Sequence, residues 1–400
     1  MGLLAGVGKS TNRRPELAGR EAATAALAPL NGAKPALVLV FATADYEQTA
    51  LLAAIRECTG DAPLAGCSGT GIITQEGSDE GGHAVGVLAL AGAGVRAASV
   101  LAREGTADPV ACGRDLAQKL CAHDLSAARL VLLFAEGLTL NCAQVLAGLR
   151  ETLGLPCAVV GAAAADAFTF DRTFQYCDGE AASNAVAAVV LSGDLRAEIE
   201  VSHGCDAIGL EQTITRAEGG WVHEIGGQPA WTFFKDYLDD DSAGLDALKI
   251  AFLCLAERLP SSLHDEYGEF IIRVPLELNA ATGALFFAGD LRTGARVHLA
   301  LRNAGHICAR AVESAGRILS RRSDRPALML QFDCVGRGQL LFSDRTTEQL
   351  IDPVQRLFGK ELPWLGLHTY GEIAPIGGQA YFHNFTVALC ALYGEPDGGA

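Results

Sequence analysis

Residues 130–161, LVLLFAEGLTLNCAQVLAGLRETLGLPCAVVG, decide the fold class. The apolar run Leu130 to Phe134 predicts a strand, the spacing of apolar residues over Cys142 to Leu153 predicts a helix, and Cys157 to Val160 predicts a second strand. A helix that links two successive strands favours parallel pairing through a right-handed crossover. The stretch therefore predicts an α/β fold.

The same order of elements occurs before and after this stretch. The first copy lies at Ala36 to Phe41, Glu47 to Cys58 and Pro63 to Cys67, and the third at Ala327 to Phe332, Thr347 to Phe358 and Trp364 to Thr369. A loop and a further strand follow each copy, and a glycine lies within or just after each second strand, at Gly66, Gly161 and Gly366. We therefore expect an α/β protein of mixed β-sheets with crossover helices, built from repeated strand-helix-strand-loop-strand units in two lobes.

The acidic segment Asp239 to Ser242 is the expected joint between the lobes. It divides an N-terminal lobe, residues 31–238, from a C-terminal lobe, residues 239–400. Residues 1–30 lack periodicity and are expected to form a tail or an entry helix. Within them, Gly6 to Ser10 resembles part of a phosphate loop, but Leu3 stands where the first glycine is required, so we predict no nucleotide site.

Composition excludes several classes of protein. The 400 residues carry a net charge of −16, whereas a protein that tracks nucleic-acid phosphates needs a basic surface. No apolar run reaches the ~18 residues of a membrane helix, and we expect the basic N-terminal residues not to belong to a signal peptide. The 12 cysteines include no Cys-x-x-Cys pair, which favours reduced thiols and no zinc site. We expect a soluble, cytoplasmic protein without nucleic-acid or membrane partners.

The first candidate ligand contacts lie in the loop after Gly66. Backbone N–H groups there, with the side chains of Cys67, Ser68 and Thr70, would form a cradle for a small anion, or the loop is a tight turn that needs glycine. Ser68 also lies in a sequence close to a nucleophile elbow, although Thr70 replaces the closing glycine. A serine hydrolase is therefore a second alternative function.

The second candidates lie in the C-terminal repeat. Alternation along an extended strand places His368, Tyr370 and Glu372 on one face, and the returning segment brings His383 and Asn384. These groups suit an amino acid or a similar polar metabolite, and the alternative is a hydrogen-bonded network that fixes the loop.

Arg337 follows the third repeat's first strand, at the edge where α/β sheets bind ligands. Its guanidinium would either bind a ligand carboxylate through two hydrogen bonds or neutralise Asp333 or Glu372.

Several of these segments resemble the FIST sensory module, in both its N-terminal and its C-terminal parts. The likeness spans roughly residues 35–393 and is carried by residues 201–209 (VSHGCDAIG), 214–219 (ITRAEG), 226–230 (GGQPA), 332–337 (FDCVGR), 366–375 (GLHTYGEIAP) and 383–386 (HNFT). The loop Gly66 to Ile72 resembles the family's Gly-Cys-Ser loop, with Ile72 where the family usually has an acid.

The resemblance implies a sensory protein that binds a small ligand and signals to a histidine kinase or a cyclic-di-GMP enzyme. Because no output domain follows the last predicted strand, we expect it to signal in trans. The resemblance also implies an alternative, a b-type haem that responds to nitric oxide, for which His203 and Cys205 are the candidate axial ligands here. We expect a sensor rather than an enzyme, with the small ligand between two lobes.

Overall fold

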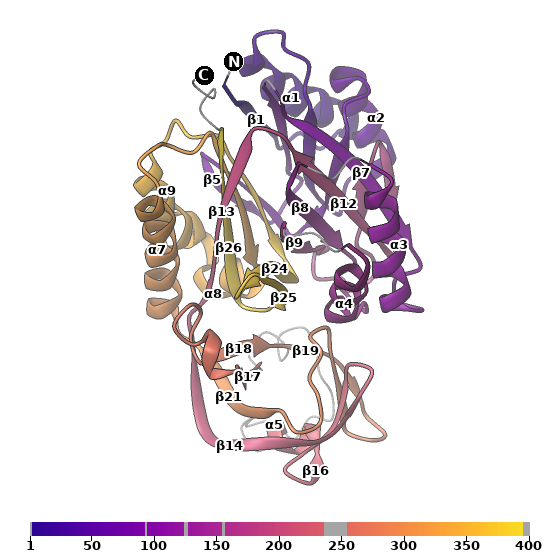
Figure 1. Cartoon of the computed structure of the whole chain (residues 1–400), viewed down its shortest axis with the longest axis vertical. Coiled ribbons are helices and arrows are strands. Elements are labelled where there is room, and N and C mark those ends of the chain that lie inside the picture. Colours follow the sequence, from indigo (N-terminus) through magenta and orange to yellow (C-terminus); the bar gives the residue numbers. More distant parts are fainter. Residues whose placement is uncertain (1, 93, 124–126, 154–156, 236–253, 395–400) are drawn as a thin grey trace.

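The chain folds as three copies of one unit around a common core, with a β-sheet module inserted into the third copy (Figure 1). The structure is a computed structural model and describes residues 2–92, 94–123, 127–153, 157–235 and 254–394. Each unit runs strand, helix, strand, helix, strand, hairpin, strand. The predicted mixed sheets and the repeat are confirmed, and each repeat begins one strand and one helix earlier than predicted.

The first unit comprises β1 (Leu4–Ser10), α1 (Pro15–Leu27), β2 (Leu37–Thr43), α2 (Gln48–Thr59), β3 (Leu64–Gly69), β4 (Gly71–Thr74), β5 (Gly77–Glu80) and β6 (Val85–Ala91). The second comprises β7 (Arg96–Arg103), α3 (Pro109–Cys121), β8 (Ala128–Ala135), α4 (Cys142–Leu153), β9 (Ala158–Ala163), β10 (Gln175–Cys177), β11 (Glu180–Ala182) and β12 (Ala185–Ser192).

The third unit comprises β13 (Leu195–His203), α7 (Ala304–Arg321), β22 (Leu328–Cys334), α8 (Gln339–Phe342), α9 (Asp352–Phe358), β23 (Trp364–Thr369), β24 (Gly371–Ile376), β25 (Gln379–His383) and β26 (Thr386–Gly394). The helix predicted over Thr347 to Phe358 is a π-helical turn, Thr347–Ile351, followed by α9. Pro353 accounts for the break, because proline donates no backbone hydrogen bond inside a helix.

The three units interlock by exchanging hairpins. Each builds a six-stranded sheet around one parallel pair, β2 with β3, β8 with β9 and β22 with β23. The sheet is completed by the hairpin of another unit: β10–β11 joins β3, β24–β25 joins β9, and β4–β5 joins β23. At the carboxyl ends of the second parallel strands, three equivalent backbone hydrogen bonds close the ring, from Thr70 N to His368 O, Ala165 N to Ser68 O and Tyr370 N to Ala163 O.

The core lies where the three sheets face one another. Phe41, Phe134 and Phe332 occupy equivalent positions on β2, β8 and β22, are fully buried, and have ring centroids 5.5 to 6.2 Å apart in edge-to-face contacts. The outer faces are covered by helices, α1 and α2 on one sheet, α3 and α4 on the second, and α7 and α9 on the third (Figure 1). The central strands are buried on both faces and are therefore continuous apolar runs.

The first residues of the chain belong to this body. Strand β1 pairs with β6, and α1 packs so closely on it that a Cβ at Gly6 or Gly8 would lie 2.2 or 2.1 Å from a carbonyl oxygen of α1. Close helix packing therefore explains the glycines that resemble a phosphate loop. No described helix is long and apolar enough to cross a membrane.

The inserted module, residues 204–303, is a separate β-sheet. It comprises β14 (Cys205–Glu218), β15 (Trp221–Ile225), β16 (Gln228–Pro229), α5 (Ala230–Lys235), β17 (Cys254–Arg258), β18 (Phe270–Arg273), β19 (Pro275–Asn279), β20 (Ala284–Phe287) and β21 (Arg296–Arg302). The predicted joint Asp239 to Ser242 lies outside the described residues. A division there would separate β14 and β15 from β20 and β21, with which they pair.

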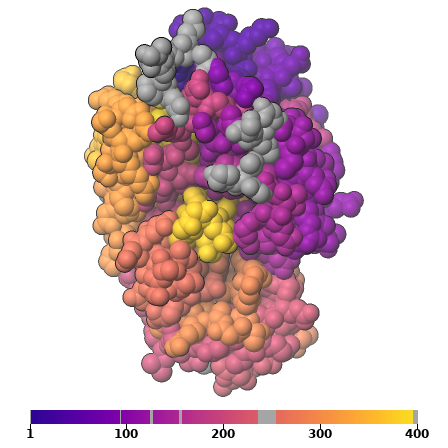
Figure 2. Space-filling model, in the orientation of Figure 1, coloured from indigo at the N-terminus to yellow at the C-terminus, as the bar shows by residue number. Residues whose placement is uncertain are grey.

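Two adjacent chain crossings connect the module to the body, which is defined here as residues 4–203 and 304–394. Asn303 N donates to Gly204 O at 3.0 Å, so the entering and leaving strands are tied together. A Cβ at Gly204 would lie 2.2 Å from Ile307 N, which leaves room only for glycine. The module packs against the body (Figure 2), and Glu266 of the module accepts a hydrogen bond from Gly377 N of the β24–β25 turn at 2.8 Å.

Candidate functional site

A small pocket lies between the body and the inserted module, beyond the carboxyl ends of the parallel pairs β8/β9 and β22/β23. Its volume is about 70 Å³. Four rings line it, those of Phe168, Phe170, Tyr370 and Phe385, together with aliphatic side chains and Asn384. This aromatic pocket occupies the place where open α/β sheets bind ligands.

Three of the four rings belong to residues with a strained backbone. Phe168, Phe170 and Phe385 have φ angles of 61°, 52° and 53°. A bulky residue rarely adopts the left-handed region, at a cost of about 1 to 3 kcal/mol, and such residues cluster at functional sites. Elsewhere in the described chain, three of the five non-glycine residues with positive φ are asparagine or aspartate, which tolerate it better. The strain is therefore concentrated at this pocket.

Asp166 holds the loop that carries Phe168 and Phe170. Its buried carboxylate accepts hydrogen bonds from Thr169 Oγ1 and from the backbone N of Asp171, each at 2.9 Å. The other oxygen accepts a 2.6 Å hydrogen bond from the Tyr370 hydroxyl, and burial together with this bond raises the pKa of Tyr370. With its hydroxyl committed, Tyr370 presents only its ring to the pocket.

The aromatic rings contact one another at the mouth of the pocket. Phe170 stacks on Tyr370, with ring centroids 5.5 Å apart and an angle of 7° between the planes. Phe170 is nevertheless 41% exposed, so part of this residue meets solvent. Phe168 completes the group at 6.4 Å from Tyr370.

Phe385 and Gly336 join the pocket to the module. A Cβ at Gly336 would lie 2.1 Å from Phe385 Cε1, so only glycine allows the ring to lie there. The Arg302 guanidinium of β21 lies 5.3 Å from the centre of the same ring and donates a hydrogen bond to Gly336 O. The module is thereby held to the body at the pocket wall.

Asn384 bridges the two parts through its side-chain amide. Oδ1 accepts from Val274 N of the module and Nδ2 donates to Tyr370 O of the body, each at 3.2 Å. Of the residues predicted from sequence, Tyr370 and Asn384 line the pocket.

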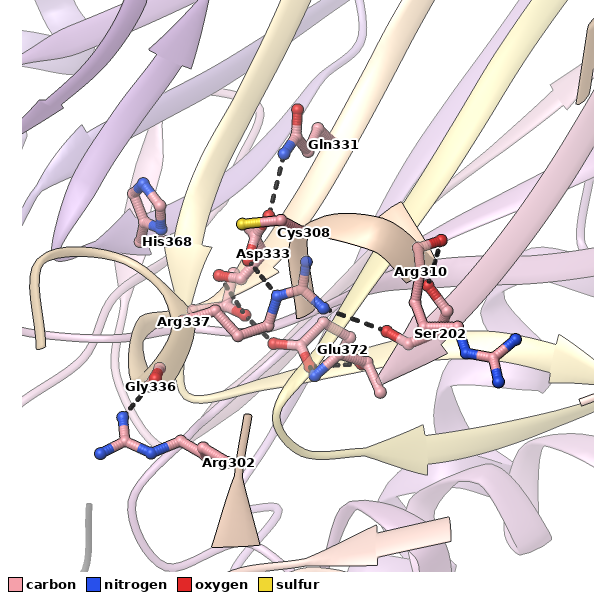
Figure 3. Close-up of polar contacts among 12 residues, drawn as sticks. Ser202, Arg302, Cys308, Arg310, Gln331, Asp333, Gly336, Arg337, His368 and Glu372 are labelled. Atoms are coloured by element: carbon pink, nitrogen blue, oxygen red, sulfur yellow. Dashed lines mark hydrogen bonds and ion pairs between the residues drawn. The ribbon is translucent and has the colours of Figure 1, made fainter. Parts of the chain in front are cut away.

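Arg337 pairs with Asp333 (Figure 3). Both side chains are fully buried, Nε donates to Oδ1 at 2.9 Å, and Nη1 donates to Ser202 O at 3.2 Å. Gln331 donates to the second oxygen of Asp333 at 2.9 Å. Neutralisation of Asp333 is thus the alternative that the structure shows, and Arg337 does not line the pocket.

The extended strand predicted over Gly366 to Pro375 is interrupted. At Tyr370 the chain leaves the sheet of β23 and enters the sheet of β24, because Tyr370 N bonds to β9 rather than continuing along β22. His368 and Glu372 therefore lie in different sheets, which corrects their expected alignment on one face.

Glu372 and His383 are cross-strand partners on β24 and β25, but their side chains are used within the protein. The Glu372 carboxyl group accepts from the hydroxyls of Thr369 and Thr386, each at 2.6 Å, and burial raises its pKa to about 8. His383 Nε2 lies 3.1 Å from Ala374 O and Nδ1 lies 3.3 Å from the Tyr267 hydroxyl. Burial lowers the pKa of His383 to about 3, so the ring is neutral at physiological pH.

His368 faces away from the pocket. Its Nε2 lies 2.8 Å from Ser78 Oγ and 3.5 Å from a carboxylate oxygen of Glu80, and its Nδ1 has no hydrogen-bond partner among the described residues. Thr70 is buried beside the β3–β4 turn, and its hydroxyl is likewise without a partner in the described part of the chain.

Ser68 and Cys67 hold the fold at the end of β3. The Ser68 hydroxyl donates to Ala165 O at 2.7 Å and accepts from Phe174 N at 3.0 Å, so it fixes both ends of the loop that carries Phe168 and Phe170. Cys67 is a core side chain whose burial raises the pKa of its thiol.

His203 and Cys205 do not fit haem ligation. Nδ1 of His203 accepts from Cys205 N at 3.1 Å, so Nε2 carries the proton and donates to Phe270 O at 3.1 Å. No lone pair of the imidazole is left for iron. Cys205 is buried in an apolar cluster that includes Cys254 and Phe385, and the adjoining pocket of about 70 Å³ has no room for a tetrapyrrole.

The phenylalanines that line the pocket are not among the site residues predicted from the sequence. Phe168 and Phe170 lie in a stretch, AAADAFTFDRT, between two strands, and a pair of aromatic residues in such a loop is a signal that could have been used. Phe385 belongs to the HNFT motif but carries no polar group that would mark it as a ligand contact. The supporting carboxylate Asp166 precedes the pair and is likewise absent from the predicted site.

Comparison with known proteins identifies the chain's relatives. The FIST N domain matches residues 36–228 and the FIST C domain matches residues 230–375. An uncharacterized protein of Mycobacterium tuberculosis is 26% identical over 392 residues, which cover 96% of this chain and 98% of that protein. A second, from Mycobacterium bovis, is 26% identical over 388 residues, which cover 96% and 97%. The solved structure of cyanuric acid hydrolase from A. caulinodans covers 98% of this chain and 99% of its own, at 10% identity and a TM-score of 0.37, a likeness too low to bear on function.

Proposed function

This chain belongs to the FIST family, with both the N-terminal and the C-terminal domain, and from that premise we propose that it is a sensory protein that binds a small ligand in the aromatic pocket. The observation that supports the proposal is the concentration of strained phenylalanines there: Phe168, Phe170 and Phe385 all have positive φ and all line the pocket. A fold retains such strain where function requires it.

The position of the pocket supports a role in signalling. It is lined from the body by Tyr370 and from the module by Val274 and Leu276. The module is joined to the body by the crossings at Gly204 and Asn303, and by contacts such as Arg273 Nη1 to Phe382 O at 2.6 Å. A ligand that contacts both parts stabilises one arrangement over others by its difference in affinity for them. We propose that the ligand thereby shifts the position of the module relative to the body, and that this shift is the signal.

The proposed recipient of the signal follows from the resemblance to the FIST sensory module. We propose that the protein acts in trans on a histidine kinase or a cyclic-di-GMP enzyme. Binding without turnover is the expected behaviour, because the Ser68 hydroxyl that a hydrolase would need is committed as both donor and acceptor.

Ligand-induced thermal stabilisation tests the proposal, because a ligand that binds only the folded state raises its melting temperature. The purified chain is screened against the common amino acids and a set of one- and two-ring aromatic compounds. Leu138→Trp fills the pocket, and Leu357→Trp adds the same bulk at a site 44% exposed on α9.

We expect at least one compound to stabilise the wild type and Leu357→Trp but not Leu138→Trp. Equal stabilisation of all three proteins, or no stabilisation of any, contradicts the proposed site. A Soret band in protein expressed with a haem precursor, lost in His203→Ala, would instead favour the haem alternative and require the His203 ring to leave Phe270.

A further inference from the structure

The polar atoms around the aromatic pocket are already used by the protein. The Tyr370 hydroxyl donates to Asp166, and the Asn384 amide is shared between Val274 N and Tyr370 O. No side chain of lysine, arginine, histidine, aspartate or glutamate is among the described residues that line the pocket. An ammonium or carboxylate group placed there would lose its hydration against a lining that has no charged side chain, which is costly.

The pocket is too small for a complete ring unless one lining side chain moves. An apolar cavity of about 150 Å³ takes up benzene, whereas this pocket has about 70 Å³. Phe170 is the lining residue best placed to move, since it is 41% exposed and has a φ of 52°. Its ring lies on Tyr370 in a stacked geometry that a flat guest could take over.

We propose that the aromatic pocket selects an uncharged, flat aromatic molecule, whose ring stacks on Tyr370 in place of the Phe170 ring. The inference rests on the proposed function and names the ligand class for the same site. Rotation of the Phe170 side chain uncovers the Tyr370 ring, while the hydrogen bonds from Thr169 and Asp171 to Asp166 keep the loop backbone in place. The guest then fills the space between Tyr370 of the body and Leu276 of the module.

Isothermal titration calorimetry on the full chain tests the ligand class with defined probes. Indole is the neutral flat probe, indole-3-acetate adds a carboxylate to the same ring, and phenol is compared with cyclohexanol to isolate aromaticity. We expect indole to bind at least about tenfold more tightly than indole-3-acetate, and phenol more tightly than cyclohexanol.

Variants assign the stacking partner. Tyr370→Phe keeps the ring but removes the hydroxyl that bonds to Asp166, so it should weaken indole binding less than Tyr370→Leu, which should weaken it about tenfold. Phe170→Ala should bind indole as tightly as the wild type or more tightly, because the competing ring is absent. The melting temperature of each variant is measured alongside, so that a loss of folding is recognised.

The outcomes separate the two proposals. If amino acids or indole-3-acetate bind more tightly than indole, and Leu138→Trp abolishes that binding, the ligand class is overturned and the proposed function stands. If Phe170→Ala weakens indole as much as Tyr370→Leu, Phe170 is a fixed wall and the exchange of rings is overturned. If Leu138→Trp binds indole as the wild type does, both the site and the ligand class are overturned.

Discussion

Glu372→Gln is expected to make the protein more stable at alkaline pH. Glu372 is fully buried among Thr369, Thr386 and Asp333, and burial, with a further contribution from Asp333, raises its pKa from 4.5 to about 8. Because the folded state holds the proton more tightly than the unfolded state, this group stabilises the fold fully below the unfolded pKa. That stability is lost as pH rises through the folded pKa.

The size of the effect follows from the two pKa values. Linkage of a single group with unfolded and folded pKa values of 4.5 and about 8 predicts a loss of roughly 3 kcal/mol between about pH 5.5 and about pH 8.5. Glutamine keeps the shape of the side chain and its acceptor for the Thr386 N–H, but it does not ionise. The variant should therefore gain about that amount relative to the wild type over the same interval.

Urea denaturation at several pH values measures this difference directly. All other titrating groups are common to the two proteins, so the difference between their unfolding free energies isolates Glu372. Glu361→Gln, at an exposed position, is the matched control and should give profiles parallel to the wild type. Parallel profiles for Glu372→Gln would refute the argument that burial keeps this carboxyl group protonated.

Three further predictions concern other parts of the fold. Burial lowers the pKa of His383 from 6.5 to about 3, so this group contributes stability that is present above the unfolded pKa and is lost as the pH falls. Between about pH 6.5 and about pH 4, the unfolding free energy of the wild type should fall by roughly 3 kcal/mol more than that of His383→Gln in urea titrations. Phe332→Ala removes one of the three phenylalanine rings at the centre of the core and should lower the unfolding free energy by about 3 to 5 kcal/mol at neutral pH. A decrease of less than about 1 kcal/mol would show that the packing of the three sheets does not depend on this ring. Gly336→Ala should lower stability by about 1 to 3 kcal/mol through collision with Phe385, whereas Gly316→Ala on α7, where a Cβ meets nothing within 4 Å, should be neutral or stabilising in the same thermal melts.

The repeated unit could be predicted from the sequence because its information is local. Apolar strands such as Leu130 to Phe134 and the helix Cys142 to Leu153 carry their own periodicity, and a crossover helix implies a parallel pair. The exchange of hairpins could not be predicted, since β10 has three residues and pairs with β3, more than 100 residues earlier. Short strands with distant partners leave no pattern in the sequence.

Of the residues that line the candidate site, Tyr370 and Asn384 could be predicted from the sequence, whereas the three phenylalanines could not. Polarity selected residues such as Glu372 and His383, and buried polar groups in a native fold are normally hydrogen-bonded to that fold. The pocket rings instead depend on backbone angles that no sequence pattern reveals: Phe168 and Phe170 read as ordinary apolar residues until their positive φ is known.

Buried polar residues nevertheless hold the two loops that carry the lining of the aromatic pocket. Ser68 fixes both ends of the loop 165–174, and Asp166 fixes its middle. Glu136 organises the facing loop by accepting hydrogen bonds from the backbone of Leu138 at 2.7 Å and of Leu140 at 2.8 Å.

Each of these buried side chains binds backbone groups and so determines where an aromatic or aliphatic side chain lies, at Phe168, Phe170 and Leu138. An unsatisfied backbone group is costly in a dry environment, so this arrangement holds the loops without placing a free polar atom in the pocket. The polar residues therefore position the pocket lining, and the rings make the contacts with the proposed ligand.

Substitution of Ser68 by alanine should for that reason change ligand affinity only through the geometry of Phe168 and Phe170. A Ser68→Ala protein that keeps the wild-type loop should bind indole as the wild type does.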